Sequence, residues 1–383
     1  MPLNAVLLPP GPQLSDLLAA ALDGGPAILP LDPQGSATAR DRLLQRLRPD
    51  ALVDGAGVHP LPDPAPLDDD IAVVVATSGS SGRPKGVQLS AAALLHSATA
   101  TLTRLAARPR QRWLCCLPTH HIAGLQVLVR SLVAASAPVI HPRFDPSALA
   151  DTDADFVSLV PTMLHRALEA GVDLSRFHRI LLGGASASPM LLEQAAEAGG
   201  RVTTTYGMSE TCGGAVYDGV PLDGVEVGVE PADGVIRLRG PVLAHGYRLD
   251  PAATATAFVD GWYVTPDVGA RSPNGGLRVL GRRDDMIITG GVNVSLQQVA
   301  AVLAARRGVA EAAAYARADP EWGQRIVAVV VPRDPAPTLT ELRAFVAEAI
   351  EPAAAPRELI LVEALPLLPS GKLDRQALPG LAG

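Results

Sequence analysis

The sequence has few of the features that mark secreted, membrane-spanning or nucleic-acid-binding proteins. It has only three cysteines, two of them adjacent, and no C-x-x-C pair, which argues against a disulfide framework and against a cysteine-rich metal site. No window of about 18 residues is apolar without polar interruption, and the N-terminus lacks the basic segment of a signal peptide. We therefore expect a reduced, cytoplasmic protein without a membrane span.

Positive charge is also scarce relative to negative charge. Lys and Arg together number 32 and Asp and Glu 39, which gives a formal net charge of −7. The absence of a basic run argues against a nucleic-acid partner. An anionic small molecule would therefore have to be bound by local donors and not by a global positive field.

The sequence does contain an alternation of short β-branched runs and amphipathic segments. Hydrophobic residues make up 48% of the 383 residues, which is enough for buried cores in two or three domains. The alternation predicts a parallel sheet covered on both faces, whose ligands lie beyond the carboxyl ends of the strands. The predicted helices are 12–24, 37–49, 91–105, 123–135, 161–170 and 189–198, and the predicted strands are 26–30, 71–76, 113–117, 138–141, 156–160, 179–182 and 201–205.

Three other regions have a different texture. Residues 54–70 are rich in Pro and Asp and are predicted to be a loop, and residues 219–280 are predicted to be short strands with turns between them. After Gly281 a small α+β unit is expected, with helices near 295–306 and 338–350. We place the boundary at residues 282–285, which divides the chain into domains 1–281 and 282–383.

A turn rich in glycine and hydroxyl side chains follows the predicted strand 71–76. Consecutive backbone N–H groups in such a turn bind anions, and glycines let a ligand approach closely, so triphosphate is the natural ligand. The turn is not a Walker A loop, because Gly82 is followed by Arg-Pro-Lys. An ordinary surface loop is an equal alternative on composition alone, but the position after a buried strand favours phosphate binding. The candidate residues are Thr77, Ser78, Gly79, Ser80, Ser81, Gly82 and Lys85.

Three weaker signals follow along the chain, and each of them alone would be read as a solvated loop. Glu210 could hold Mg²⁺ through its carboxylate oxygens while Tyr206 stacks on a flat base. Asp267 could accept hydrogen bonds from ribose hydroxyls. Lys372, which follows Ser-Gly near the C-terminus, is a candidate catalytic cation.

Together the motifs resemble, in content and in order, the acyl-adenylate-forming superfamily of acyl-CoA synthetases, adenylation domains and luciferases. One departure is Pro266, where the family's ribose motif usually has glycine. Proline fixes φ and removes an N–H group, so we expect ribose binding with a shifted backbone. The resemblance covers about residue 70 to the C-terminus, and its motifs are the phosphate loop 77–86, the adenine-side segment 183–185, the nucleotide and Mg²⁺ motif 206–211, the ribose motif 262–267, the hinge 281–291 and the lysine loop 369–372.

The resemblance implies an α/β fold: a large N-terminal domain of αβα-layered sheets with a small β-subdomain, and a small mobile α+β C-terminal domain. It implies ATP, Mg²⁺ and coenzyme A, with a carboxylate converted to an acyl-adenylate and then to a thioester. Lys372 would stabilise charge in the first step. The small domain would then turn about Asp284, so that Gly290 and Gly291 line the coenzyme A channel. Further implied nucleotide-binding residues are Gly184, Ala185, Tyr206, Gly207, Ser209, Asp267 and Arg282, with Glu210 for the metal.

The acyl pocket is specified by fewer residues. Residues 117–124 are similar to the family's pocket-wall motif, in which His121 matches an aromatic or histidine gate with a catalytic and substrate-binding role; a structural histidine at a helix start is the alternative. Arg130 on the following helix is suited to bind a second carboxylate, unless it is merely solvated. The pattern resembles o-succinylbenzoate–CoA ligases of menaquinone synthesis, whose substrate is a dicarboxylate. The small residues Gly183 and Gly207 leave room for an aromatic ring.

Three alternatives stay open. An acyl-CoA synthetase for another aryl, short-chain or fatty acid would gain nothing from a buried cation at residue 130. A stand-alone adenylation enzyme that loads a carrier protein often has a pocket aspartate, and none is evident in residues 121–130. A nucleotide-binding scaffold without activity would be expected to lack Lys372 or Glu210. The sequence leaves the oligomeric state open, a homodimer included.

Overall fold

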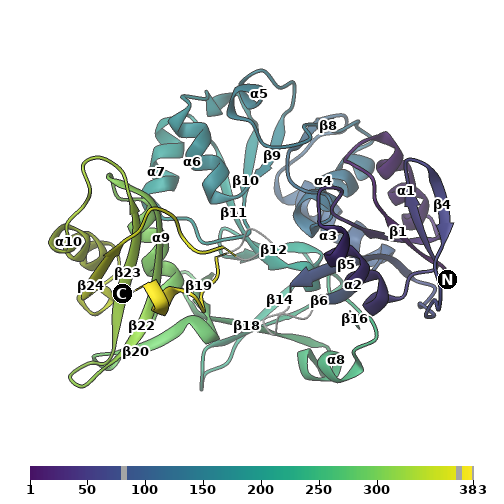
Figure 1. The fold of residues 1–383 in the computed structure, drawn as a ribbon. Helices are drawn as coiled ribbons and strands as arrows, with labels where there is room; N and C mark the ends of the chain where they lie inside the picture. The colour runs from purple at the N-terminus through teal and green to yellow at the C-terminus, as the bar shows by residue number, and fades with distance from the viewer. Residues whose placement is uncertain (79–83, 368–372, 382–383) are drawn as a thin grey trace.

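The computed structural model describes residues 1–78, 84–367 and 373–381, and these residues form four β-sheets (Figure 1). Two seven-stranded sheets and the helices around them make up most of the large domain. A five-stranded antiparallel sheet lies beside them, and a second five-stranded sheet belongs to the C-terminal region. Among the described residues, no helix is both long and apolar enough to cross a bilayer.

The first sheet has a parallel centre and antiparallel edges, in the order β16-β6-β5-β2-β1-β3-β4. Its central strand β5 begins with the run Ile-Ala-Val-Val-Val, which is buried on both faces, as expected for a covered sheet. The strands are β1 (Leu3–Val6), β2 (Ala27–Pro30), β3 (Ala51–Asp54), β4 (Gly57–Pro60), β5 (Ile71–Ser78), β6 (Pro84–Ser90) and β16 (Gly246–Tyr247).

The second sheet has the order β13-β12-β11-β10-β9-β7-β8, and it is parallel from β8 to β11. Strand β12 pairs antiparallel with β11, and β13 pairs antiparallel with β12. The strands are β7 (Trp113–Cys115), β8 (Val139–Ile140), β9 (Phe156–Leu159), β10 (Arg179–Leu182), β11 (Val202–Met208), β12 (Gly213–Tyr217) and β13 (Val220–Pro221).

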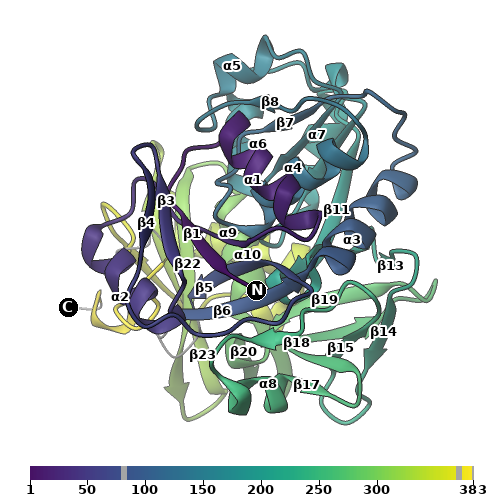
Figure 2. The same cartoon turned by 90° about the vertical axis from the view of Figure 1, so that its right-hand side faces the viewer.

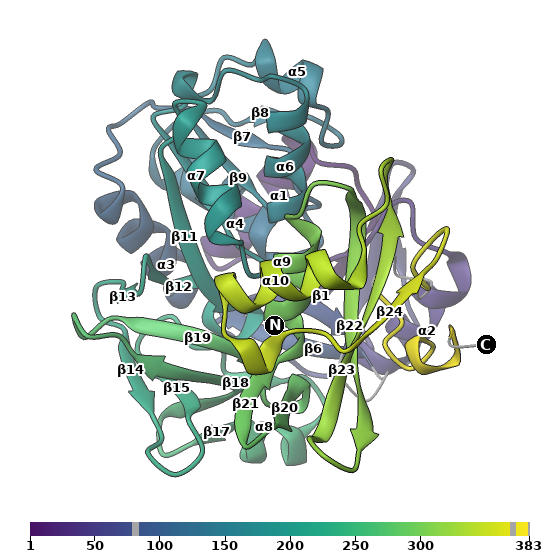
Figure 3. The same ribbon diagram turned by 90° about the vertical axis from the view of Figure 1, so that its left-hand side faces the viewer.

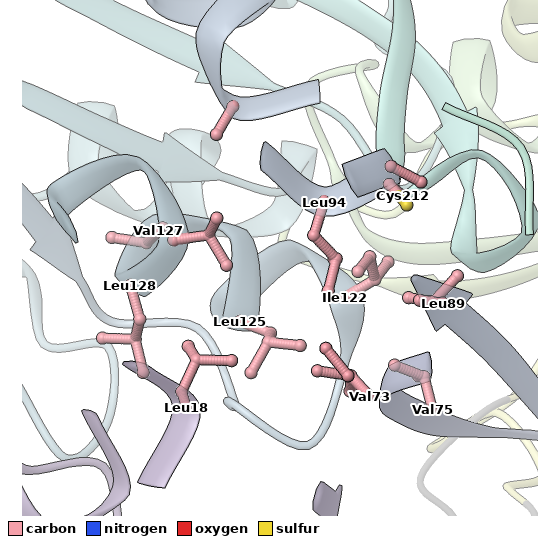
Figure 4. Close-up of a cluster of buried hydrophobic side chains, with 14 of the residues drawn as sticks. Leu18, Val73, Val75, Leu89, Leu94, Ile122, Leu125, Val127, Leu128 and Cys212 are labelled. Atoms are coloured by element: carbon pink, nitrogen blue, oxygen red, sulfur yellow. The ribbon is translucent and has the colours of Figure 1, made fainter. Parts of the chain in front are cut away.

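Helices separate and cover these two sheets. Helices α3 and α4 lie between them in one apolar core that takes side chains from both sheets (Figure 4). Helix α2 packs on the outer face of the first sheet and α1 on its inner face (Figure 2), while α6 and α7 cover the outer face of the second sheet. The helices are α1 (Pro12–Leu22), α2 (Ala37–Leu47), α3 (Ala91–Arg104), α4 (Ile122–Val133), α5 (Pro146–Ala150), α6 (Pro161–Glu169) and α7 (Pro189–Glu197).

Local chemistry explains where these helices begin. A serine directly before the predicted helix 91–105 predicts an N-cap at Ser90. Its Oγ accepts a hydrogen bond from the N–H of Ala93 at 3.2 Å, as that prediction requires. Ser188 caps α7 in the same way. Proline occupies the first turn of α1, α6 and α7, where its missing N–H removes no helical hydrogen bond.

The remaining two sheets are formed by the rest of the chain (Figure 3). Strand β19 ends at Arg282 in the third sheet and β20 begins at Met286 in the fourth, so the predicted boundary at 282–285 falls between them. The third sheet contains β14 (Glu226–Val229), β15 (Val235–Arg239), β17 (Phe258–Val259), β18 (Trp262–Arg271) and β19 (Leu277–Arg282), with α8 (Pro251–Ala257) beside it. The fourth contains β20 (Met286–Thr289), β21 (Val292–Ser295), β22 (Val309–Asp319), β23 (Gly323–Pro332) and β24 (Glu358–Leu361), with α9 (Leu296–Ala304) and α10 (Leu339–Ala349).

Three expectations from the sequence need correction. Residues 54–70 are not all loop, because β4 pairs with β3 as an exposed edge strand that carries no apolar alternation. The alternating part forms two sheets with antiparallel edges, and not one parallel sheet. Finally, Tyr206 lies within β11 and not after it, since this strand continues to Met208.

Candidate active site

One large cavity lies where the carboxyl ends of the second sheet's strands meet the first and third sheets. Its volume is about 990 Å³, and it opens toward the C-terminal region, from which Arg283 and Gln297 line it. Most of the predicted site residues meet there. They are Thr77, Lys85, Arg130, Gly183, Gly184, Ala185, Tyr206, Gly207, Ser209, Glu210, Asp267 and Arg282.

The other predicted residues lie elsewhere or are not described. Gly79, Ser80, Ser81, Gly82 and Lys372 lie outside the described residues, and Ser78 ends β5. The hinge residue Asp284 lies in a short 3-10 helix, η3 (Arg283–Asp285), and pairs with Arg282. Gly290 and Gly291 form the turn between β20 and β21, and they are not among the residues that line the cavity.

Asp267 is held by a tyrosine from the neighbouring sheet. The hydroxyl of Tyr206 donates to Oδ2 of Asp267 at 2.8 Å. Burial raises the pKa of Asp267, and this hydrogen bond opposes that shift by stabilising the carboxylate. Asp267 lines the cavity, where its carboxylate can accept hydrogen bonds from a polyol.

Pro266 disturbs this arrangement less than the sequence suggested. It lies at an irregularity in the ladder between β18 and β15, where Val264 and Val268 are paired but Pro266 is not, and pairing with β19 starts at Asp267. The missing N–H of the proline therefore removes no ladder hydrogen bond. The hydroxyl of Thr265 accepts from the N–H of Asp267 at 3.1 Å, which fixes the aspartate's backbone.

Glu210 lies in a second short 3-10 helix, η2 (Ser209–Thr211), directly after β11. Its Oε1 accepts a hydrogen bond from the hydroxyl of Tyr247 at 2.8 Å, and its backbone oxygen accepts from the N–H of Ala244 at 2.9 Å. The Nζ of Lys85 lies 4.4 Å from the centre of the Tyr247 ring. One cation and one carboxylate therefore lie on either side of the same tyrosine, an arrangement suited to a phosphate that binds together with a metal ion.

The donor set around Glu210 fits Mg²⁺ better than a metal held by protein alone. Among the described residues, no three His, Cys, Asp or Glu side chains gather into a metal-binding group. Mg²⁺ is commonly bound through one or two carboxylates together with substrate phosphates and water. A single carboxylate beside a lysine is compatible with that kind of site.

Two glycines in the cavity wall are required by close packing. A Cβ atom on Gly183 would lie 2.3 Å from the Oγ1 of Thr205, and one on Gly207 would lie 1.9 Å from the oxygen of Gly213. Any side chain at these positions would push β10 or β12 away from β11. The wall at this point is therefore backbone, which leaves space for a flat ligand.

The opposite end of the cavity carries a buried cation. Arg130 on α4 is 6% exposed, and its Nη2 donates to the Oγ of Ser158 at 3.1 Å. Its guanidinium lies 4.3 Å from the ring centre of Trp113, which in turn stacks on Phe156. Burial lowers the pKa of Arg130, and no Asp or Glu of the described chain pairs with it.

The ionisable groups beside Arg130 do not supply a counter-charge. Burial raises the pKa of Cys115 to about 12 and also raises the pKa of Tyr217, so both are neutral near pH 7. The Nε atom of Arg130 has no partner in the described structure. A buried cation in this state can gain free energy from an anionic ligand.

His121 is not placed at the cavity wall as predicted. It is the exposed N-cap residue of α4, its ring lies 4.3 Å from that of His120, and it is not among the residues that line the cavity. Ile122, Gln126 and Arg130 line it instead, because residues four apart share a helix face. This spacing is visible in the sequence and could have indicated Gln126.

Sequence reasoning also missed two tyrosines and one arginine. Tyr247 and Tyr263 line the cavity; Tyr247 lies outside the predicted motifs, and Tyr263 lies within the ribose motif but was not singled out. Arg248 is buried and donates to backbone oxygens of Leu47, Arg48, Ala65 and Pro66, which ties the N-terminal segment to β16. Their partners are distant in sequence, so no local pattern predicts them.

Comparison with known families gives two matches. The family described as AMP-binding enzyme matches residues 31–247, and the family described as AMP-binding enzyme C-terminal domain matches residues 298–372. A probable 2-succinylbenzoate–CoA ligase from Mycobacterium tuberculosis is 45% identical over 328 residues, which cover 82% of this chain and 85% of that protein. A 2-succinylbenzoate–CoA ligase from Bacillus licheniformis is 35% identical, with coverage of 81% and 70%.

Solved structures give a consistent result. An o-succinylbenzoate CoA synthetase from Bacillus subtilis, in complex with its acyl-adenylate intermediate, has a TM-score of 0.86 at 28% identity and covers 98% of this chain and 88% of its own. The same enzyme with ATP and magnesium ion has a TM-score of 0.85, with coverage of 99% and 89%. An amide bond synthetase from Marinactinospora thermotolerans also reaches 0.85, at 26% identity and with coverage of 100% and 90%. Similarity of fold alone therefore does not determine which acceptor receives the acyl group.

Proposed function

Since the chain belongs to the AMP-binding enzyme family, we propose that it is an ATP-dependent 2-succinylbenzoate–CoA ligase of menaquinone biosynthesis. The relatives that carry this activity in their names match most of the chain, at up to 45% identity. The observation that carries the proposal is Arg130, a buried cation that lines the same cavity as the nucleotide motifs and that pairs with no Asp or Glu among the described residues. 2-Succinylbenzoate has two carboxylates, so one can be activated while the other pairs with this arginine.

The reaction has two steps. In the first, an oxygen of the substrate carboxylate attacks the α-phosphorus of ATP, the bond to the bridging oxygen breaks and pyrophosphate leaves. In the second, the sulfur of coenzyme A attacks the acyl carbon, its thiol proton is lost, and AMP leaves. No covalent bond to the protein is required, and burial raises the pKa of Cys115 and Cys116 to about 12, which makes both poor nucleophiles.

The cavity residues bind and orient the nucleotide in this proposal. Asp267, fixed by Tyr206, accepts hydrogen bonds from the ribose hydroxyls, and the backbone walls at Gly183 and Gly207 leave room for the rings. Lys85 and Glu210 lie on the triphosphate side of the cavity. When Mg²⁺ is bound it neutralises charge on the phosphate oxygens; Glu210 is the residue that would hold it.

The C-terminal domain, residues 282–383, supplies the catalytic lysine in this proposal. Lys372 stabilises charge on the reacting carboxylate and the α-phosphate during the first step. The domain then turns about Asp284, so that Gly290 and Gly291 come to line the path of coenzyme A. Arg282 and Arg283 already line the cavity next to the hinge. The cytoplasm is the proposed compartment, since all three cysteines are buried free thiols.

The test is pyrophosphate–ATP exchange with a panel of carboxylic acids, followed by thioester formation with coenzyme A. We expect 2-succinylbenzoate to support exchange without coenzyme A and to give the thioester with it. Benzoate, butyrate and long-chain fatty acids should support exchange at least about tenfold less well. Equal exchange with a monocarboxylate would favour another acyl-CoA synthetase, and transfer to a pantetheinylated carrier protein in preference to coenzyme A would favour a loading enzyme.

A further inference from the structure

Tyr247 stands apart from the motifs, although it contacts both charged groups on the triphosphate side of the cavity. Its hydroxyl donates to Oε1 of Glu210 at 2.8 Å. The face of its ring lies 4.4 Å from the Nζ of Lys85. One side chain thus joins a carboxylate from the end of the second sheet to a lysine from the first sheet.

The backbone around Tyr247 is firmly held. Strand β16 pairs with β6, where Tyr247 lies opposite Val87, and the N–H of Tyr247 donates to the Oγ1 of Thr254 at 2.9 Å. The next residue, Arg248, donates to four backbone oxygens and also bonds through its own N–H to the oxygen of Gly86 at 2.7 Å. A side chain on this anchored strand can fix the groups that it contacts.

Glu210 accepts two hydrogen bonds from the segment that contains Tyr247. Its backbone oxygen accepts from the N–H of Ala244, and its side chain accepts from Tyr247. The phenol occupies one carboxylate oxygen, Oε1, and thereby restricts rotation of the carboxylate in the cavity. Hydrogen bonds of this kind commonly orient carboxylates that bind metals, and their loss costs about 10–100-fold in metal affinity or activity.

We propose that Tyr247 is a positioning residue that presents Glu210 to Mg²⁺ with its hydroxyl and Lys85 to the triphosphate with its ring. The inference rests on the proposed function, because it needs ATP and Mg²⁺ to be the ligands of this end of the cavity. The two contacts are made by different parts of the side chain, and they can be removed separately. Tyr247→Phe removes the hydroxyl and keeps the ring over Lys85, whereas Tyr247→Leu removes both.

A tyrosine in the same cavity provides a matched control. Tyr206 also donates its hydroxyl to a carboxylate at 2.8 Å, but that carboxylate is Asp267 on the ribose side. Tyr206→Phe therefore removes an equivalent phenol from the cavity without touching Glu210 or Lys85. It should weaken ATP binding and leave the Mg²⁺ dependence of that binding as it is in the wild type.

The experiment is calorimetric titration of each purified full-length protein with ATP, first in EDTA and then over a series of free Mg²⁺ concentrations, without any carboxylic acid. For Tyr247→Phe we expect the Mg²⁺ concentration that gives half of the affinity gain to rise about tenfold or more, with the affinity for ATP in EDTA unchanged. Tyr247→Leu should also weaken ATP binding in EDTA, because Lys85 loses its ring contact.

Two results would overturn the role of Tyr247. One is a Tyr247→Phe protein whose Mg²⁺ midpoint stays within about twofold of the wild type, which would make the tyrosine a packing residue. The other is an equal shift of the Mg²⁺ midpoint in Tyr206→Phe, which would make the effect a general consequence of losing a tyrosine hydroxyl from the cavity. Pyrophosphate exchange with 2-succinylbenzoate is measured on the same wild-type preparation. If the wild type shows no exchange, the proposed function fails. If it shows exchange and Tyr247→Phe still leaves the Mg²⁺ midpoint unchanged, only the role of Tyr247 fails.

Discussion

The two ends of the cavity treat charge in opposite ways. At the nucleotide end, the carboxylates of Glu210 and Asp267 each accept a hydrogen bond from a tyrosine hydroxyl before any ligand is bound. At the acyl end, Arg130 is more deeply buried, and its partners among the described residues are a serine hydroxyl and the face of a tryptophan. The difference indicates that the nucleotide end is preorganised by the protein, whereas the acyl end leaves a charge for the substrate to neutralise.

The largest effect is expected where the two ends meet, at the reacting carboxylate. Lys372→Ala should lower the rate of adenylate formation by about 10²–10³-fold or more, because the proposed role of this cation is to stabilise the charge that develops in that step. Thioester formation from preformed acyl-adenylate should be nearly unchanged, since the lysine acts in the first step only. Single-turnover measurements of each half-reaction test this role, and equal losses in both would refute it.

The second largest effect is expected from removing the buried charge at the acyl end. Arg130→Leu should lower kcat/KM for 2-succinylbenzoate by about 30–1000-fold, since an unpaired substrate carboxylate in a buried pocket costs about 2–4 kcal/mol. The same change should raise the free energy of unfolding by about 1–4 kcal/mol, because it removes a buried charge that no carboxylate of the described residues neutralises. Steady-state kinetics measure the expected loss of kcat/KM, and thermal denaturation measures the expected gain in stability.

Arg130→Lys is the matched control for that change. It retains the positive charge but loses the planar fork that lies on Trp113 and bonds Ser158. We expect its activity to fall between the wild type and Arg130→Leu. A lysine variant as impaired as the leucine variant would show that geometry, and not charge, dominates at this end.

A smaller effect is expected at the ribose side of the nucleotide end. Asp267→Asn should weaken ATP binding by about tenfold, in keeping with the loss of charged hydrogen bonds to the ribose. Burial raises the pKa of Asp267, so its ionised form opposes folding at pH 7 and ceases to do so as the pH falls through that raised pKa. The substitution should therefore not lower the melting temperature at pH 7, and a clear decrease would contradict this assignment.

The smallest effect is expected outside the cavity, where Glu169 on α6 pairs with Arg333 of the C-terminal domain. Both side chains are partly exposed, so the pair should contribute no more than about 1 kcal/mol. Arg333→Glu should change the ratio of the two half-reaction rates by a few fold, and the double variant with Glu169→Arg should restore it. An unrestored double variant would indicate that the charge pair does not influence the domain's orientation.

The sequence predicted the nucleotide end better than the acyl end for a physical reason. The residues proposed to bind phosphate, ribose and metal lie in short contiguous motifs, and a pattern of that kind is local. The acyl pocket is lined by single residues of distant elements, so His121 was predicted on its wall while Gln126 was not recognised. Tyr247 was missed for the same reason, since its partners Glu210 and Lys85 lie far from it in the chain.

The fold, too, was predicted well where the signal is local and poorly where it depends on residues distant in the sequence. Buried runs such as Ile71–Val75 and the Ser90 cap of α3 were predicted correctly, because burial and capping leave local signals. The edge strand β4 was predicted as loop, since its pairing with β3 depends on backbone groups and not on an apolar pattern. The division into two sheets could not be read from alternation, which does not say which strands are neighbours.

The most direct test of this difference between the two ends concerns the proposed contact between Arg130 and the second carboxylate of the substrate. It removes each of these two groups in turn. The kcat/KM values of the wild type and of Arg130→Leu are measured with 2-succinylbenzoate and with its two mono-acid analogues, each of which lacks one carboxylate. We predict that loss of the carboxylate that is not activated lowers kcat/KM of the wild type by at least about 30-fold and has almost no effect on Arg130→Leu. The same ratio in both proteins would show that Arg130 does not bind the second carboxylate.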